Sequence, residues 1–116
     1  MKINNNEEIL PAEVKMDGAK DVKMRMLIGI DDESDNIFMR HFIIASGGNT
    51  PFHKHNYEHV VKIENNKGIV VDENGKEHEV KKGQSIFVKP NEMHQFRNPY
   101  SEDFEFICII PNPEKK

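Results

Sequence analysis

Residues 47–59 read GGNTPFHKHNYEH and place three histidines, His53, His55 and His59, at even spacings along one short segment. Side chains that are two residues apart on an extended strand leave the same face of a sheet. We predict an uninterrupted strand over residues 53–63. The three imidazole rings then converge on one side of that strand.

Two histidines that are two residues apart are often no more than a polar strand edge, so His53 and His55 alone leave a metal site open. A third histidine in phase, His59, favours a shared partner, because buried imidazoles without hydrogen-bond partners are costly. A divalent transition-metal ion is such a partner, since neutral imidazole is its commonest protein ligand. The segment therefore predicts a metal site.

The sequence on both sides of this segment has the two-residue period of β-strands, with turn residues between the strands. Alternation predicts one inward set on the first strand: Val22, Met24, Met26, Ile28 and Ile30. Further strands are predicted at residues 38–45, 69–72, 76–80, 85–88, 94–97 and 104–110. No stretch has helical periodicity. The pattern predicts an all-β sandwich or barrel, with a jelly roll as the best single architecture.

Composition limits the classes of partner and the number of domains. The 116 residues suffice for one domain, with an N-terminal arm at residues 1–20 and a barrel core at residues 22–111. The net charge of −4 and the absence of a basic block argue against a nucleic-acid partner. The polar first ten residues and the lack of a long apolar run predict a cytoplasmic protein without a membrane segment.

A fourth histidine, His94, follows the turn Pro90-Asn91 in a separate segment. Taken alone, it is a turn histidine exposed to water. The two histidine segments together, however, resemble the paired motifs of the cupin superfamily. The residues that fit are Gly47, His53 and His55 in the first motif and Gly83, His94 and Asn98 in the second. The departures are His59 for a glutamate, Asn66 and Asn91 for glycines, and Lys89 for a proline.

The histidine in place of glutamate is similar to a subgroup of small four-histidine cupins associated with manganese and oxygenase-type chemistry. This resemblance implies a single-domain jelly-roll barrel, the double-stranded β-helix, and a homodimer. It also implies one divalent ion with four ligands: His53, His55, His59 and His94. Manganese or iron is favoured by the resemblance, with nickel or zinc possible, because imidazole ligands do not select among these metals.

The last strand and the strand before the first motif supply candidates for a substrate pocket. Phe104, Phe106 and Cys108 share the face of the last strand that we expect to point inward. Cys108 is either a buried apolar residue or a thiol near the metal, and Phe106 either lines the pocket or packs in the core. Arg40 is suited to an anionic substrate or, equally, to a salt bridge at an edge or a dimer contact. His41 and His78 we take as surface residues.

These residues predict a metal-binding protein, and the leading hypothesis is a dioxygenase-like oxidoreductase acting on a small organic molecule. The alternatives are a non-catalytic small-molecule, sugar-binding or sensor domain, and a cupin-type isomerase or lyase. No aspartate, glutamate or tyrosine is in phase with the ligands, which counts against a proton-shuttling isomerase. Oxygen activation depends more on open metal positions than on a titrating base.

Overall fold

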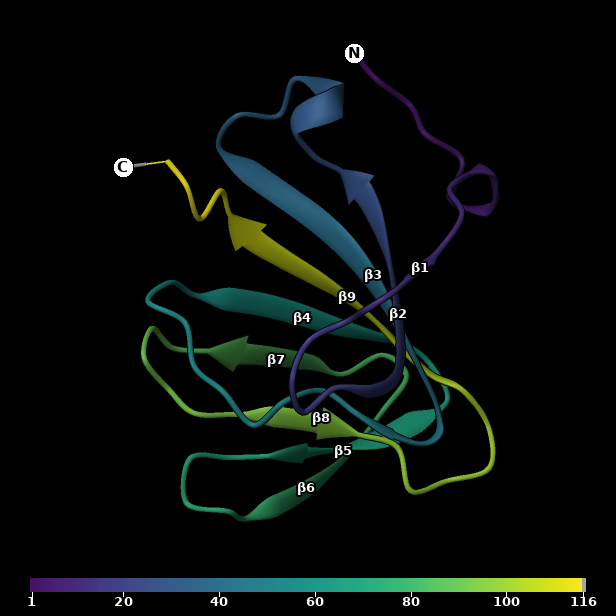
Figure 1. Ribbon diagram of the computed structural model, residues 1–116, viewed down its shortest axis with the longest axis vertical. Coiled ribbons are helices and arrows are strands. Elements are labelled where there is room, and N and C mark those ends of the chain that lie inside the picture. Colours follow the sequence, from purple (N-terminus) through teal and green to yellow (C-terminus); the bar gives the residue numbers. More distant parts are fainter. Residues whose placement is uncertain (116) are drawn as a thin grey trace.

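The computed structural model describes residues 1–115, which form nine strands and two single-turn 3-10 helices (Figure 1). The 3-10 helices are η1 (Asn6–Glu8) and η2 (Ile30–Asp32). The strands are β1 (Ala12–Glu13), β2 (Lys20–Ile28), β3 (Ile37–Asn49), β4 (His59–Asn65), β5 (Lys67–Val71), β6 (Glu77–Lys81), β7 (Ser85–Val88), β8 (Gln95–Arg97) and β9 (Phe104–Pro111). No helix in this part of the chain is long and apolar enough to cross a bilayer.

The strands form one antiparallel sheet that curls on itself. Its hydrogen-bonded order is β6-β5-β8-β3-β9-β4-β7, with β2 added to β3 and β1 added to β2. Strand β3 is long enough to pair with β2 and β9 along its length and with β8 at its end, where Asn49 lies opposite Arg97. Figure 1 shows β2, β3, β9 and β4 in one half of the molecule and β8, β5 and β6 in the other. The predicted all-β barrel is confirmed as this curled sheet.

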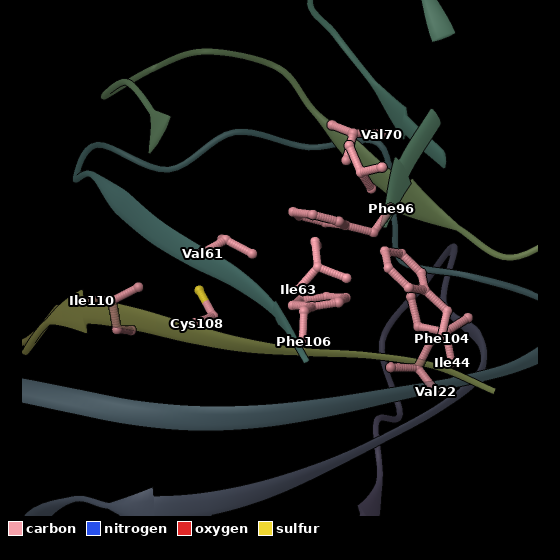
Figure 2. Close-up of a cluster of buried hydrophobic side chains, with 11 residues drawn as sticks. Val22, Ile44, Val61, Ile63, Val70, Phe96, Phe104, Phe106, Cys108 and Ile110 are labelled. Atoms are coloured by element: carbon pink, nitrogen blue, oxygen red, sulfur yellow. The ribbon is translucent and has the colours of Figure 1, made fainter. Parts of the chain in front are cut away.

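The inner face of the sheet holds the core, because alternate residues of each strand point into the curl. Strand β9 shows this most clearly: its even-numbered residues are buried and its odd-numbered residues are partly exposed. Figure 2 shows side chains from β2, β3, β4, β5, β8 and β9 meeting in this interior. The fully enclosed ones include Val22, Ile44, Val61, Ile63, Phe104 and Phe106.

Strand β2 departs from the predicted alternation. It ends at Ile28, and its register with β3 shifts between Met26 and Ile28. Met26 pairs with Arg40 and is 38% exposed. After the shift Ile28 pairs with Met39, and together with Leu27, which is 4% exposed, it lies beside Ile107 and Ile109 on the outer side of the sheet. Ile30, predicted to face inward, begins η2 and is 57% exposed. A bulge reverses the facing of every later residue on a strand, so the simple alternation fails there.

Two asparagines stand in left-handed backbone where the resemblance implies glycine. Asn66 has a φ of 60° and Asn91 a φ of 64°, and asparagine tolerates this region better than most residues. Gly68, two residues after Asn66, is needed for another reason: a Cβ there would lie 2.2 Å from two ring carbons of Phe104. The turns survive the substitutions, and the close approach of β5 to β9 depends on Gly68.

His41, expected at the surface, is buried to 8% exposure on the outer side of the sheet. Its Nε2 lies 2.9 Å from Glu105 Oε1, and the Arg25 guanidinium lies 3.1 Å from its Nδ1. Arg25 also donates to the carbonyl of Ile9 at 2.7 Å. The imidazole therefore belongs to a polar network that ties the N-terminal arm to the sheet. His78, the other histidine assigned to the surface, is exposed.

Candidate metal centre

A backbone bridge joins the two histidine segments. His53 and His94 form an isolated antiparallel pair, in which His53 N donates to His94 O at 3.1 Å and His94 N donates to His53 O at 2.9 Å. The continuous strand predicted over residues 53–63 is wrong, because β4 begins only at His59 and residues 54–58 are irregular. The imidazoles converge because of this bridge, and not because they share one strand face.

Three imidazoles form a cluster. One ring nitrogen each from His53, His55 and His94 lies within 4.8 Å of the other two. Nitrogens bound to one ion at about 2.1 Å are separated by at most about 4.2 Å. Small side-chain rotations therefore bring the three nitrogens to bonding distance, and this donor set fits a divalent transition metal.

His59 adjoins this cluster without being one of its three members. It is the first residue of β4 and is 5% exposed. Its ring centroid lies 5.0 Å from that of His55 and 5.1 Å from that of His94. Its Nδ1 is buried without a hydrogen-bond partner. The structure thus brings all four predicted histidines together, with ring nitrogens of three of them within 4.8 Å of one another.

The surroundings of the rings keep them neutral, which is the form that binds metal. Burial lowers the pKa of His53 to about 4, and the neighbouring His55 and His94 rings add to the effect. Burial likewise lowers the pKa of His59 to about 3, aided by His94 and His55. The pKa values of His55 and His94 are also lowered, with burial as the main cause. His94 Nδ1 lies 2.9 Å from the carbonyl oxygen of Glu92, which makes Nδ1 the protonated nitrogen and leaves Nε2 free.

The metal-free protein is expected to lose stability as the pH falls from 7 toward 4. In that window the unfolded chain, with histidines of ordinary pKa, binds protons that folded His53 and His59 do not bind. Thermal unfolding followed by circular dichroism in the presence of chelator, at pH 7.5 and pH 5, measures the effect. A His53→Gln variant, which lacks one of these groups, should show a shallower pH dependence. An identical dependence in the variant and the parent protein would contradict this explanation.

A cavity of about 170 Å³ opens in front of the imidazoles. Its walls are largely apolar, and no aspartate or glutamate is among them. Besides the four histidines, the lining residues are Val14, Met16, Ala19, Val22, Met24, Arg40, Phe42, Thr50, Pro51, Phe96, Phe106 and Cys108. The N-terminal arm contributes Val14, Met16 and Ala19, which lie in a stretch without periodicity and so gave no signal in the sequence. Met24, by contrast, is in phase with Val22 on β2.

Three of the four predicted pocket residues line this cavity: Arg40, Phe106 and Cys108. Phe104 does not, because it lies deeper in the core against Gly68. Cys108 is 2% exposed and its sulfur accepts a hydrogen bond from Arg40 Nη2 at 3.2 Å. Burial raises the pKa of this thiol, so the sulfur stays protonated. Tyr57 stacks on the His55 ring at a centroid distance of 5.0 Å.

Two buried polar residues hold the segments around the site. Thr50 Oγ1 accepts a hydrogen bond from Phe96 N at 2.9 Å, which fixes the end of β3 against β8. Asn98 donates through Nδ2 to the carbonyls of Ile44 at 2.9 Å and Glu102 at 2.7 Å. Asn98, which fits the second motif, therefore has a structural role: its side-chain amide provides hydrogen bonds to backbone carbonyl groups.

Comparisons with known proteins agree with this architecture. A family model described as "Cupin domain" matches residues 40–110. The polyketide cyclase RemF from Streptomyces resistomycificus superposes with a TM-score of 0.91 at 28% identity, over 96% of this chain and 79% of RemF. A Thermotoga maritima protein described as a predicted oxalate decarboxylase superposes with a TM-score of 0.84 at 25% identity, over 95% of this chain and 98% of that protein. KdgF from Halomonas sp., at 13% identity, shares the fold, with a TM-score of 0.78 over 96% of this chain and 94% of KdgF. A comparison with curated proteins found no match.

Proposed function

This chain belongs to the cupin domain family, whose model matches residues 40–110, and from that premise we propose that it is a metal-dependent enzyme acting on a small organic molecule. The observation that carries the proposal is the placement of three neutral imidazoles at one end of an apolar cavity. A divalent ion held there, when bound, supplies a Lewis acid for substrate oxygens and, if redox-active, a site for dioxygen chemistry. His53, His55 and His94 would hold it, and we propose His59 as the fourth ligand.

Ring closure without oxidation is the reaction that we favour. RemF, the 28% identical structure, is a polyketide cyclase. In such a ring closure a carbon between two carbonyl groups gives up a proton and attacks another carbonyl carbon of the same molecule, and the oxygen of that carbonyl takes up the proton, so that no acid, base or oxidant is consumed. The apolar walls from Phe42, Phe96 and Phe106 suit a substrate of this kind, because they exclude water and keep the reacting chain compact.

A dioxygenase-like oxidation is the second candidate, and the ligand set favours it. Four neutral imidazoles leave the full charge of a divalent ion uncompensated, and a six-coordinate ion would keep two positions open. This reaction would use a redox-active ion such as manganese or iron, whereas ring closure would also proceed with zinc, which is not redox-active. The choice of metal, the oxidation and the homodimer stay predictions.

Protein purified without an affinity tag, loaded separately with Mn²⁺, Fe²⁺ or Zn²⁺ and given a linear poly-β-ketone acid, distinguishes the two reactions. We expect substrate loss without oxygen uptake, with a product mass equal to the substrate or lower by one water, as measured by an oxygen electrode and mass spectrometry. Oxygen uptake with a product that gains two oxygen atoms would favour the dioxygenase instead. A His55→Ala variant, which lacks one ligand, serves as the inactive control.

A further inference from the structure

Arg40 is the feature of the cavity that the metal centre does not explain. It lies on the inner face of β3, opposite Cys108 of β9, and its guanidinium carbon sits 5.0 Å from the centre of the Phe42 ring. Its one side-chain hydrogen bond among residues 1–115 goes from Nη2 to the Cys108 sulfur, which is a weak acceptor. Its Nε is buried with no partner at all.

The charge on Arg40 has no counterion within the described chain. No ion pair there includes Arg40, and no carboxylate lines the cavity. The other two arginines of the chain have stronger partners: Arg97 pairs with Glu77, and Arg25 donates to the Ile9 carbonyl. A guanidinium stays charged at physiological pH, and because Arg40 is partly buried and its Nε is enclosed, its charge carries a desolvation cost that a bound anion would offset.

Neither the Cys108 thiol nor the imidazoles neutralise the charge of Arg40. The Cys108 thiol stays protonated because burial raises its pKa, so it supplies no negative charge. The imidazoles are neutral, and Arg40 itself contributes to the lowered pKa of His53, His55 and His59. The field of the guanidinium therefore reaches the metal end of the cavity. An ion bound to the histidines would add to the positive charge there.

We infer that the cavity takes a small organic carboxylate, with its charged group on Arg40 and its apolar body against Phe42, Phe106 and Met24. This inference rests on the proposed function and names its substrate class. A single planar guanidinium matches the two oxygens of a carboxylate, and Nε and Nη2 lie on the edge that such a group contacts. A phosphate dianion is disfavoured in the metal-free protein, because Arg40 is the single lysine or arginine among the residues that line the cavity.

Paired acids and amides test the inference on the protein itself. Phenylacetate, benzoate and hexanoate are each compared with the neutral amide of the same shape, by isothermal titration calorimetry and by ligand-observed NMR. We expect at least one acid to bind, and its amide to bind about 10- to 100-fold more weakly, as for a lost charged hydrogen bond. Equal affinities within a pair, or no binding by any of the three acids, would overturn the inference.

Substitutions locate the binding site of the acid. Arg40→Gln should weaken acid binding about 10- to 100-fold and leave amide binding unchanged. Arg40→Lys keeps the charge and should restore part of the affinity, and it also serves if the glutamine variant unfolds. Arg97→Gln, outside the cavity on β8, is the matched control and should bind like the parent protein. Unchanged acid binding by folded Arg40→Gln and Arg40→Lys proteins would contradict a role for Arg40.

Both sets of measurements are made on Zn²⁺-loaded and on chelator-treated protein. Binding of the acid to the metal-free protein that depends on Arg40 supports the inference whether or not the protein proves to be a metal enzyme. Acid binding that is independent of Arg40 and disappears with the metal would place the carboxylate on the ion. That result would overturn the inference and leave the metal centre of the proposed function intact.

Discussion

Replacing His94 with alanine is expected to abolish stoichiometric metal binding. His94 is 4% exposed and supplies one of the three nitrogens that lie within 4.8 Å of one another. Loss of groups that merely support a ligand lowers metal affinity about 10- to 100-fold, so loss of the ligand itself should exceed about 100-fold. Elemental analysis of protein purified without an affinity tag, followed by titration with Zn²⁺ against a competing chelator, measures the change.

The matched control is His78→Ala, which removes an exposed histidine that contacts Asp72 and is not a member of the histidine cluster. This variant should bind metal like the parent protein. Full metal content in folded His94→Ala protein would show that the ion, if any, binds elsewhere.

His59→Ala separates a three-ligand from a four-ligand centre. A reduction of affinity comparable to that of His94→Ala makes His59 a ligand. Unchanged affinity would restrict the centre to His53, His55 and His94, and the unpartnered Nδ1 of His59 would then need another explanation.

The second large effect is expected at Phe106, where substitution by alanine should destabilise the protein by about 3–5 kcal/mol. The ring is 1% exposed and lies at the centre of an aromatic group, with centroids 4.4 Å from Phe96, 5.2 Å from Phe42 and 5.4 Å from Phe104. Its removal leaves a void between the core and the cavity. Urea unfolding of metal-free protein, followed by circular dichroism, gives the difference in the free energy of unfolding.

Phe87→Ala is the control for this substitution, because Phe87 is 59% exposed on β7. A surface change of this kind is expected to stay within about 0.5 kcal/mol. Equal effects of the two substitutions would mean that Phe106 does not pack as the structure has it.

Much of the fold could be predicted from alternation, because burial on one face leaves a two-residue period in the sequence. The even-numbered residues of β9, from Phe104 to Ile110, are buried as predicted. The failures lie where the backbone departs from a regular strand. The register shift after Met26 places Ile28 opposite Met39, on the outer side of the sheet, and such a bulge has no signature in hydrophobicity alone.

The clustered histidines were predicted correctly, but from the wrong assumption that they lie on one continuous strand. Even spacing suggested one strand face, yet His53 and His55 precede the strand that His59 begins. What joins them to His94 is a long-range backbone pair, and pairing between distant segments cannot be derived from local pattern. The same holds for Val14 and Met16, whose contact with the cavity depends on where the arm folds back, and for His41, whose burial depends on Arg25 and Glu105.

The bridge between His53 and His94 has a consequence for how the sheet opens. These two residues stand on either side of β4, β5, β6 and β7 in the sequence, so an ion held by both would act as a reversible cross-link around four strands. A cross-link restricts the unfolded chain and stabilises what it encloses. Local opening of the β5–β6 hairpin, which pairs with β8 directly after His94, would then be rarer when the ion is bound, and amide hydrogen exchange in that hairpin would report on occupancy of the centre.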